Sequence, residues 1–256
     1  MKAVLITTQG LAAASEKYLT DARSLLGKSI AAHRNTAEFR DLFKTCLAAE
    51  AVLQGLDSSA LSPGLAPLRT IVLRIPLLAA AGQSSIVKVE LRRYIEITFW
   101  VVYFSHHPIE WLHFSGKRGS GFSKDARKPI AFAASRDLNA FVEYAREYME
   151  PEPSGIAARA ISLLEQDKKV LNAAVHAGEI ARAPSLNLPV DKPSPTESRK
   201  LAAMIKRIIG HSVLLLGGFN KNAFNGLAAG PRAYFDWVIP SAFRKDIRKG
   251  TFGMST

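Results

Sequence analysis

Hydrophobic residues recur at spacings of three and four along most of the chain, a periodicity typical of amphipathic α-helices. Residues 15–32 and 36–56 each carry one such stripe, with Ser15 and Thr36 available as N-caps. The stripes consist of Tyr18, Leu19, Ala22, Leu25, Leu26 and Ile30, and of Phe39, Leu42, Phe43, Cys46, Leu47 and Val52. The turn-rich sequence DSSALSPG follows the second stripe. We therefore predict an N-terminal helical hairpin over residues 1–64.

The rest of the chain, residues 65–256, continues the same pattern and predicts an all-α helical bundle. Further helices are expected at 65–82, 85–105, 135–149, 158–178 and 198–217, with a turn of helix at 108–114 and a shorter helix before Trp237. Pro76 is expected to kink or end its helix, Gly178 to close another, and Ser198 to cap the next. A linker rich in proline and serine spans residues 182–198. Strand structure is expected at most at the N-terminal KAVLI.

The run ITFWVVYF at residues 97–104 suits a strand as well as a buried helix, because periodicity cannot separate the two in so short a segment. Its context favours helix. Arg92 and Glu96 have the spacing of an ion pair along one helical face, and the polar residues before the run make the segment longer than a typical strand. We predict a central core helix whose charged start and terminal His106 and His107 lie at the bundle surface.

The composition is that of a globular protein, with 48% hydrophobic and 22% charged residues in a chain of 256. Its single cysteine, Cys46, cannot form an internal disulfide and lies on an apolar stripe, which favours a buried structural thiol in a reducing compartment. No uninterrupted apolar run reaches the roughly 18 residues that span a bilayer. The short apolar run near the N-terminus is broken by polar residues. We therefore predict a cytoplasmic protein that does not enter a membrane.

The net charge of +12 is the strongest compositional signal. Such surfaces attract phosphate backbones, because each neutralised phosphate releases condensed counterions. The alternative is a solvated surface that only keeps the protein soluble. A predicted loop, KRGSGFSKDARK, carries the residues that we expect to bind RNA or DNA: Lys117, Arg118, Lys124, Arg127 and Lys128. A second basic set in the C-terminal third comprises Arg199, Lys200, Lys206, Arg207, Lys221, Arg232, Arg244, Lys245, Arg248 and Lys249.

The common signatures of nucleotide-binding folds and hydrolases do not occur in the sequence: GxxxxGK[ST], GxGxxG, HExxH and GxSxG. The six histidines have no paired helical spacing with carboxylates in step, which metal ligation would favour. The sequence therefore predicts neither a cofactor nor a metal site.

Two segments carry a family resemblance. LRRYIEITFWVVYFSHHPIEW joins an Arg-x-x-x-Glu helix to an aromatic run and a His-Pro-x-Glu-Trp turn, and LNAAVHAG ends a later helix. Together they resemble the HEPN-like helical proteins of bacterial defence and toxin–antitoxin systems. The resemblance implies an all-helical bundle that is often a homodimer. Its active members are metal-independent ribonucleases whose catalytic arginine and histidine are separated by four to six residues.

Arg207 and His211, in RIIGH, come closest to that catalytic pair, although only three residues separate them. On a helix they would lie one turn apart, so the cation could stabilise a developing phosphorane while the imidazole moved a proton. His176, near a helix end, is a third candidate catalytic residue. The plainer interpretation makes Arg207 a surface residue and both histidines structural.

Three functions fit these observations. The sequence favours a non-catalytic HEPN-like module that binds nucleic acid or a partner protein in a bacterial defence or toxin–antitoxin system. The alternatives are a divergent metal-independent HEPN-like ribonuclease and an unrelated helical adaptor with a basic surface. Catalysis would require arginine and histidine to converge in one cleft, a binding module needs a basic face, and an adaptor would show an exposed apolar patch.

Overall fold

The computed structural model describes residues 8–33, 36–56, 62–108, 154–181 and 195–248. These ranges contain helices and their connections, and no strand. The prediction of an all-α fold is therefore confirmed. The strand considered at the N-terminus, the helices predicted at 108–114 and 135–149, and the basic loop between them lie outside the described residues, apart from position 108.

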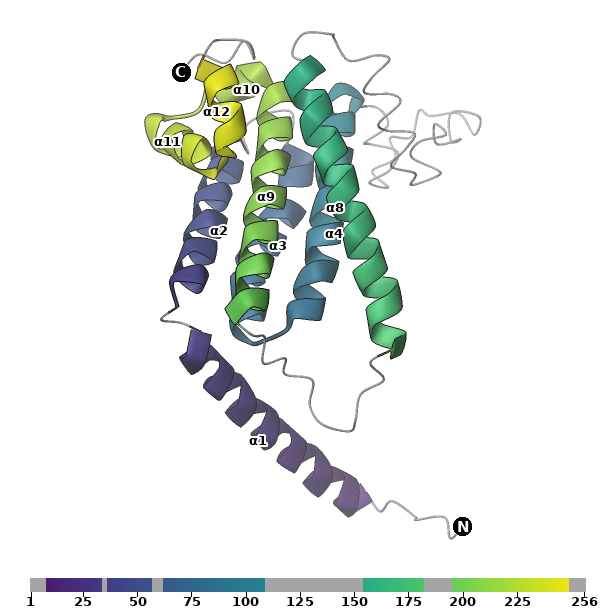
Figure 1. Cartoon of the computed structure of the whole chain (residues 1–256). Helices are drawn as coiled ribbons and strands as arrows, with labels where there is room; N and C mark the ends of the chain where they lie inside the picture. The colour runs from purple at the N-terminus through teal and green to yellow at the C-terminus, as the bar shows by residue number, and fades with distance from the viewer. Residues whose placement is uncertain (1–7, 34–35, 57–61, 109–153, 182–194, 249–256) are drawn as a thin grey trace, which may run out of the picture.

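In the part of the chain that the structure describes, five long helices form the bundle and three short ones cover one end of it (Figure 1). The helices are α1 (Thr8–His33), α2 (Ala37–Gly55), α3 (Ser62–Ala80), α4 (Ser84–His106), α8 (Ser154–Ala181), α9 (Pro195–Phe219), α10 (Lys221–Asn225), α11 (Ala229–Val238) and α12 (Ser241–Arg248). Within the bundle α2 packs against α3, α9 and α11, and α4 packs against α3, α8 and α9. Helix α1 leads away from the opposite end.

Helix α4 is the central core helix that the sequence predicts, and the run at residues 97–104 is helical. Tyr94, Phe99 and Val102 are fully buried, because the aromatic and branched side chains face three neighbouring helices. The expected Arg92–Glu96 pair forms, with 3.3 Å between Nε and Oε1, and Lys168 of α8 approaches the same carboxylate oxygen at 3.4 Å. This charged cluster joins α4 to α8.

Helix α2 begins as predicted, since the Phe39 amide donates a hydrogen bond of 3.2 Å to the Thr36 hydroxyl. Its predicted apolar stripe is only partly buried. Leu42, Cys46 and Val52 face the core, and burial raises the pKa of the Cys46 thiol. Phe43 and Leu47 are exposed instead, because the apolar arc of α2 is wider than its contact with the bundle.

The predicted N-terminal hairpin needs a correction, because α2 packs along α3 and α9 instead of α1. The boundary predicted at residue 64 therefore separates two helices that pack against each other. Helix α1 starts at Thr8, seven residues before the predicted cap Ser15, in a stretch rich in alanine, the best helix former. Its fixed point on the bundle is the Ser29 hydroxyl, which donates to the Ala80 carbonyl at 2.8 Å.

Pro76 does not end helix α3, which continues to Ala80, and both residues are buried. Two other predicted helix ends are wrong. Helix α8 continues through Gly178 to Ala181, since a glycine lowers helix stability by only about 1 kcal/mol. Helix α9 begins at Pro195 instead of after Ser198, and a proline suits the first turn because the amide it lacks would be unpaired there.

Helix α9 also changes the expectation about membrane-spanning length. By length and composition it is the one helix among the described residues that could cross a bilayer. Single polar residues interrupt its apolar run, but its mean hydropathy stays high. In the structure 67% of its most apolar window is buried inside the bundle. The core helix of a soluble protein meets the same criterion, so the packing accounts for this composition.

Candidate functional site

Arg207 lies on the face of α9 that meets α8, where Asp167 receives its guanidinium. Nε donates to Oδ2 at 3.0 Å and to Oδ1 at 3.2 Å, and Nη2 also donates to Oδ1. The Asp167 side chain is 6% exposed and that of Arg207 46%. The hydrogen bonds to Asp167 raise the pKa of Arg207. The arginine therefore neutralises a buried carboxylate while the rest of its side chain reaches solvent.

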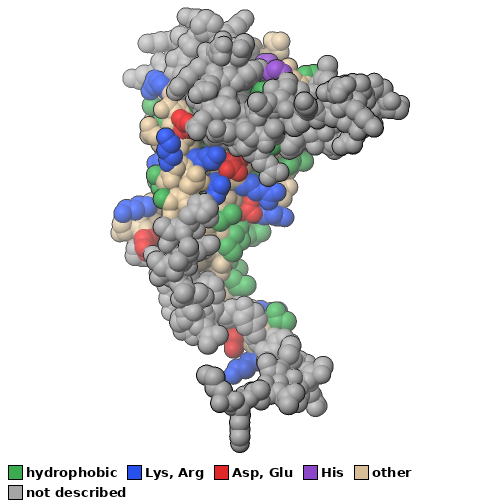
Figure 2. All heavy atoms as spheres, turned by 90° about the vertical axis from the view of Figure 1, so that its right-hand side faces the viewer, with side chains coloured by type: hydrophobic (Ala, Val, Ile, Leu, Met, Phe, Trp, Pro, Cys, Tyr) green, Lys and Arg blue, Asp and Glu red, His purple; other side chains and the backbone are tan. Residues whose placement is uncertain are grey.

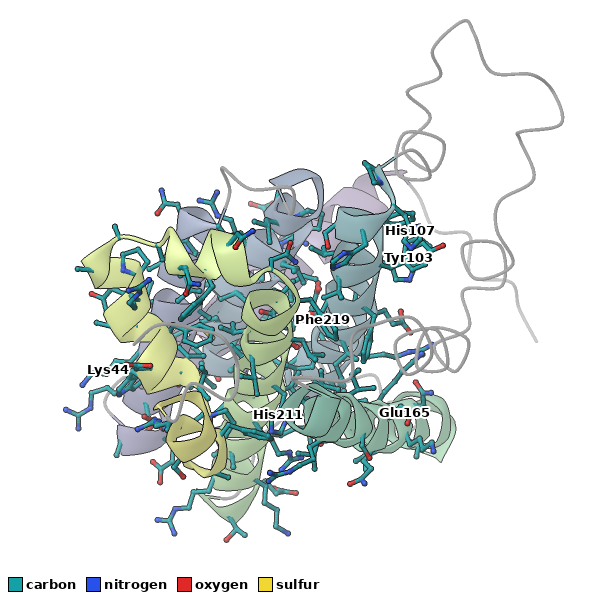
Figure 3. The ribbon with its side chains drawn as sticks, turned by 90° about the horizontal axis from the view of Figure 1, so that it is seen from above. Lys44, Tyr103, His107, Glu165, His211 and Phe219 are labelled. Atoms are coloured by element: carbon teal, nitrogen blue, oxygen red, sulfur yellow. The ribbon has the colours of Figure 1, made fainter. Side chains whose placement is uncertain are left out.

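His211 follows one turn later on α9 and is buried, with 3% of its surface exposed. Its ring meets that of Phe243 from α12 edge to face, with 5.5 Å between the centroids. Burial lowers the pKa of His211 to about 4; the Asp167 carboxylate opposes this shift and the Arg207 cation adds to it. Within the described part of the chain, Nδ1 has no hydrogen-bond partner. His211 is therefore a neutral imidazole between α8, α9 and α12 (Figure 3).

This arrangement brings Arg207 and His211 together with Asp167, which the sequence pattern did not single out. A catalytic imidazole works best when its pKa is near the working pH and it can reach a substrate proton, and His211 is shielded and has a low pKa. An arginine that stabilises a phosphorane must direct its donors at the substrate, whereas Nε and Nη2 of Arg207 point at Asp167. The geometry is that of a structural ion pair beside a core histidine.

The side chains of the other predicted site residues are not among those that the structure describes. His176 lies on the helical backbone of α8, and its side chain is not among those that the structure describes. The basic loop that carries Lys117, Arg118, Lys124, Arg127 and Lys128 lies outside the described residues.

Much of the second basic set, in the C-terminal third, holds helices together. Arg199 donates to Glu38 at 2.9 Å, and Lys206 lies 3.2 Å from Asp41, so both tie α9 to α2. The remaining contacts are made with backbone carbonyls: Arg232 with Asn225, and Arg244 with Trp237 and Ile239. These partners are distant in sequence or belong to the backbone, so the charge pattern could not reveal them.

A groove between α2 and α11 was not predicted. Its volume is about 740 Å³, and its lining residues are Ala37, Arg40, Asp41, Lys44, Leu47, Ala48, Ala51, Tyr234 and Trp237. Figure 3 shows Lys44 at the α2–α11 side of the molecule, well apart from His211. Tyr234 is 50% exposed and Trp237 is half-buried. The groove therefore combines aromatic surface with the exposed cations of Arg40 and Lys44.

One wall of the groove is fixed by an ion pair. Asp41 holds the Lys206 ammonium, which also lies 5.3 Å from the centroid of the Trp237 ring. A cation at this distance from an indole is attracted to its face, so the contact positions the Trp237 ring. The Asp41 charge is thereby offset, and the groove as a whole carries positive charge from Arg40 and Lys44.

No family model, curated protein or solved structure matches this chain.

The groove's residues come from segments that only the fold brings together. The sequence signal was present in two places: Phe43 and Leu47 widen the apolar arc of α2, and the YFDW segment places aromatic residues on one short helix. Neither pattern indicates a site by itself, because a wide apolar arc is also typical of a helix buried on two sides.

Proposed function

We propose that the protein is a non-catalytic helical module that binds single-stranded nucleic acid in the α2–α11 groove. The observation that carries this proposal is the combination of exposed aromatic rings with cations in one cavity. Proteins that bind single strands use this combination, because bases stack on aromatic faces while Lys and Arg contact the phosphates. The HEPN-like resemblance supports a place for such a module in a bacterial defence or toxin–antitoxin system.

The groove favours a single strand over a duplex. In a duplex the base faces are stacked on one another, so Tyr234 and Trp237 would have no base face to contact. A single strand can turn its bases toward the aromatic wall and its phosphates toward Arg40 and Lys44. Each stacked base contributes about 1–3 kcal/mol to the binding free energy. Each neutralised phosphate on a single strand steepens the slope of log K against log salt concentration by about 0.7.

The groove is tested by fluorescence anisotropy with labelled oligouridine and a duplex of equal length. Tyr234→Ala is expected to weaken binding of the single strand about 10-fold, because one stacking surface is lost. Lys44→Glu is expected to weaken it and to flatten its salt dependence. Both side chains are exposed, so neither change should impair folding. Lys169→Glu on α8 is the matched control: it makes the same charge change at an exposed site away from the groove and should leave binding unchanged.

A second arm of this experiment decides whether the nucleic acid binds in the groove or on the basic loop. A further variant reverses the charges of the loop residues that the sequence alone indicated as the binding site: Lys117, Arg118, Lys124, Arg127 and Lys128. If this variant loses binding while Tyr234→Ala and Lys44→Glu bind normally, the loop is the site and the groove proposal is wrong. Equal affinity for the duplex and the single strand would also contradict the stacking argument.

A further inference from the structure

Asp41 is the one carboxylate among the described residues that line the α2–α11 groove. Its side chain is 51% exposed, and its two oxygens lie 3.3 and 3.2 Å from the Lys206 ammonium. A carboxylate offers about four acceptor sites, so each oxygen can accept a further hydrogen bond. Because Lys206 offsets the negative charge, the carboxylate can lie in a groove that binds a polyanion. Asp41 is therefore an oriented acceptor that a ligand in the groove can reach.

Asp41 and Arg40 lie at opposite edges of the wall that α2 contributes to the groove. Adjacent residues on a helix are about 100° apart around its axis, since one turn takes 3.6 residues, and Lys44 falls between the two. Asp41 is on the edge next to α9, because it contacts Lys206 of that helix. A strand that places its phosphates along Arg40 and Lys44 therefore turns its bases toward Asp41.

An aromatic surface lies beside Asp41. Tyr234 and Trp237 are three residues apart on α11, so they share a face of that helix. The Lys206 ammonium that contacts Asp41 also lies 5.3 Å from the centroid of the Trp237 ring. The groove volume of about 740 Å³ is within the range of roughly 300–1,000 Å³ that holds small organic ligands. A base that stacks on the half-exposed Tyr234 ring therefore fits with its edge toward Asp41.

Ion pairing alone does not distinguish Asp41 from other carboxylates. Figure 2 shows Lys and Arg side chains beside Asp and Glu side chains on the face that includes α8. The contact between α4 and α8, for example, pairs Glu96 with Arg92 and Lys168 at 3.3 and 3.4 Å. Asp41 differs because it lines a groove together with two aromatic side chains.

Guanine is the base whose edge matches a carboxylate best. Its Watson–Crick edge presents two donors side by side, N1–H and N2–H, and an ionised carboxylate is an acceptor only. Adenine and cytosine each present one amino donor next to a ring-nitrogen acceptor, and uracil presents one N–H between two carbonyl acceptors. An acceptor opposite the carboxylate is repelled. In a single strand this edge is free for such contacts, and hydrogen bonds to a charged acceptor are the strong ones.

We propose that Asp41 makes the groove selective for guanine. The carboxylate accepts hydrogen bonds from N1–H and N2–H of a guanine that stacks on Tyr234, while the neighbouring phosphates contact Arg40 and Lys44. This inference rests on the proposed binding of single strands in the groove and names the base that the site prefers. A matched pair of hydrogen bonds to a base edge discriminates by about 5-fold to 150-fold, and we expect about 10-fold because Asp41 is half exposed.

Fluorescence anisotropy with four labelled RNAs tests the preference. Each is a short oligouridine whose central nucleotide is uridine, guanosine, adenosine or inosine. Adenosine controls for the larger stacking surface of a purine, and inosine keeps N1–H but lacks the amino group that provides N2–H. The wild type is expected to bind the guanosine strand about 10-fold more tightly than the adenosine strand, with the inosine strand between them.

Asp41→Asn is expected to bind the guanosine and adenosine strands equally, and oligouridine no more weakly than the wild type does. The amide keeps the size of the side chain but presents a donor in place of one acceptor. Asp41 is exposed, so the variant should fold, which circular dichroism checks. Glu38→Gln is the matched control, because it removes another ion pair between α2 and α9, with Arg199, outside the groove. This variant should keep the guanosine preference.

Two results would overturn the guanine preference and leave the groove proposal standing. One is equal binding of the guanosine and adenosine strands by the wild type, while Tyr234→Ala and Lys44→Glu still weaken the binding of oligouridine. The other is a guanosine preference that survives in Asp41→Asn. If neither Tyr234→Ala nor Lys44→Glu changes the binding of any strand, the groove is not the site and both proposals are wrong.

Discussion

Replacing Arg207 with alanine is expected to lower the free energy of unfolding by about 2–3 kcal/mol. The change leaves the Asp167 carboxylate buried, with 6% of its side chain exposed, and without the guanidinium that neutralises it. Removing one partner of a fully buried ion pair costs about 3–5 kcal/mol. The expected loss here is smaller, because 46% of the Arg207 side chain reaches solvent and water can approach the carboxylate once it is gone.

Arg199→Ala is the matched control on the same helix. Arg199 pairs with Glu38 at 2.9 Å, but its side chain is 71% exposed, and such surface pairs contribute less than about 1 kcal/mol. Urea unfolding of the two variants compares the two ion pairs within one helix. If Arg207→Ala is no more destabilising than Arg199→Ala, the Asp167–Arg207 pair does not stabilise the fold, and a functional role for Arg207 gains support.

Stability is expected to fall as the pH drops from about 6.5 to about 4, because His211 is buried as a neutral imidazole. Burial lowers its pKa to about 4 in the folded protein, whereas an exposed histidine has a pKa near 6.5. Between these values the unfolded chain binds a proton that the folded chain does not, so protonation favours unfolding. A difference of about 2.5 pKa units corresponds to about 3 kcal/mol, all of which is present above pH 6.5.

The His211 contribution is measured by urea unfolding of the wild type and His211→Leu at pH 4.5 and 7.5. Leucine is a suitable replacement because Nδ1 has no partner among the described residues, so an apolar side chain leaves no broken hydrogen bond there. The difference in stability between the two pH values should shrink in the variant. The same difference in both proteins would show that His211 does not titrate as a buried group.

The sequence predicted the helices well where local chemistry determines them. The Thr36 cap and the Arg92–Glu96 pair are interactions between close neighbours along one helix, and both form as expected. The hydrophobic periodicity could not predict which other element packs against each helix face. Phe43 and Leu47 have the spacing of core residues, yet no described helix covers them, and Leu19 of α1 is likewise exposed among the described residues.

The candidate site was less predictable than the fold, because its properties arise from contacts between distant segments. The spacing of Arg207 and His211 suggested a catalytic pair, but the guanidinium is bound by Asp167 of α8, and Phe243 of α12 packs against the imidazole. Likewise Lys206 looked like part of a basic face, whereas Asp41 holds it beside the groove. The short helices α10 and α12 were missed because segments of five and eight residues contain too few turns to show a period.

The central claim is that the protein binds single-stranded nucleic acid without cleaving it, and one gel experiment tests both halves. A labelled oligouridine is incubated with the purified protein in EDTA and then run on a native gel and on a denaturing gel. We expect a shifted band on the native gel, full-length RNA on the denaturing gel, and loss of the shift in the double variant Lys44→Glu and Tyr234→Ala. Cleaved RNA whose cleavage disappears in both Arg207→Ala and His211→Ala would contradict the claim and identify a metal-independent ribonuclease.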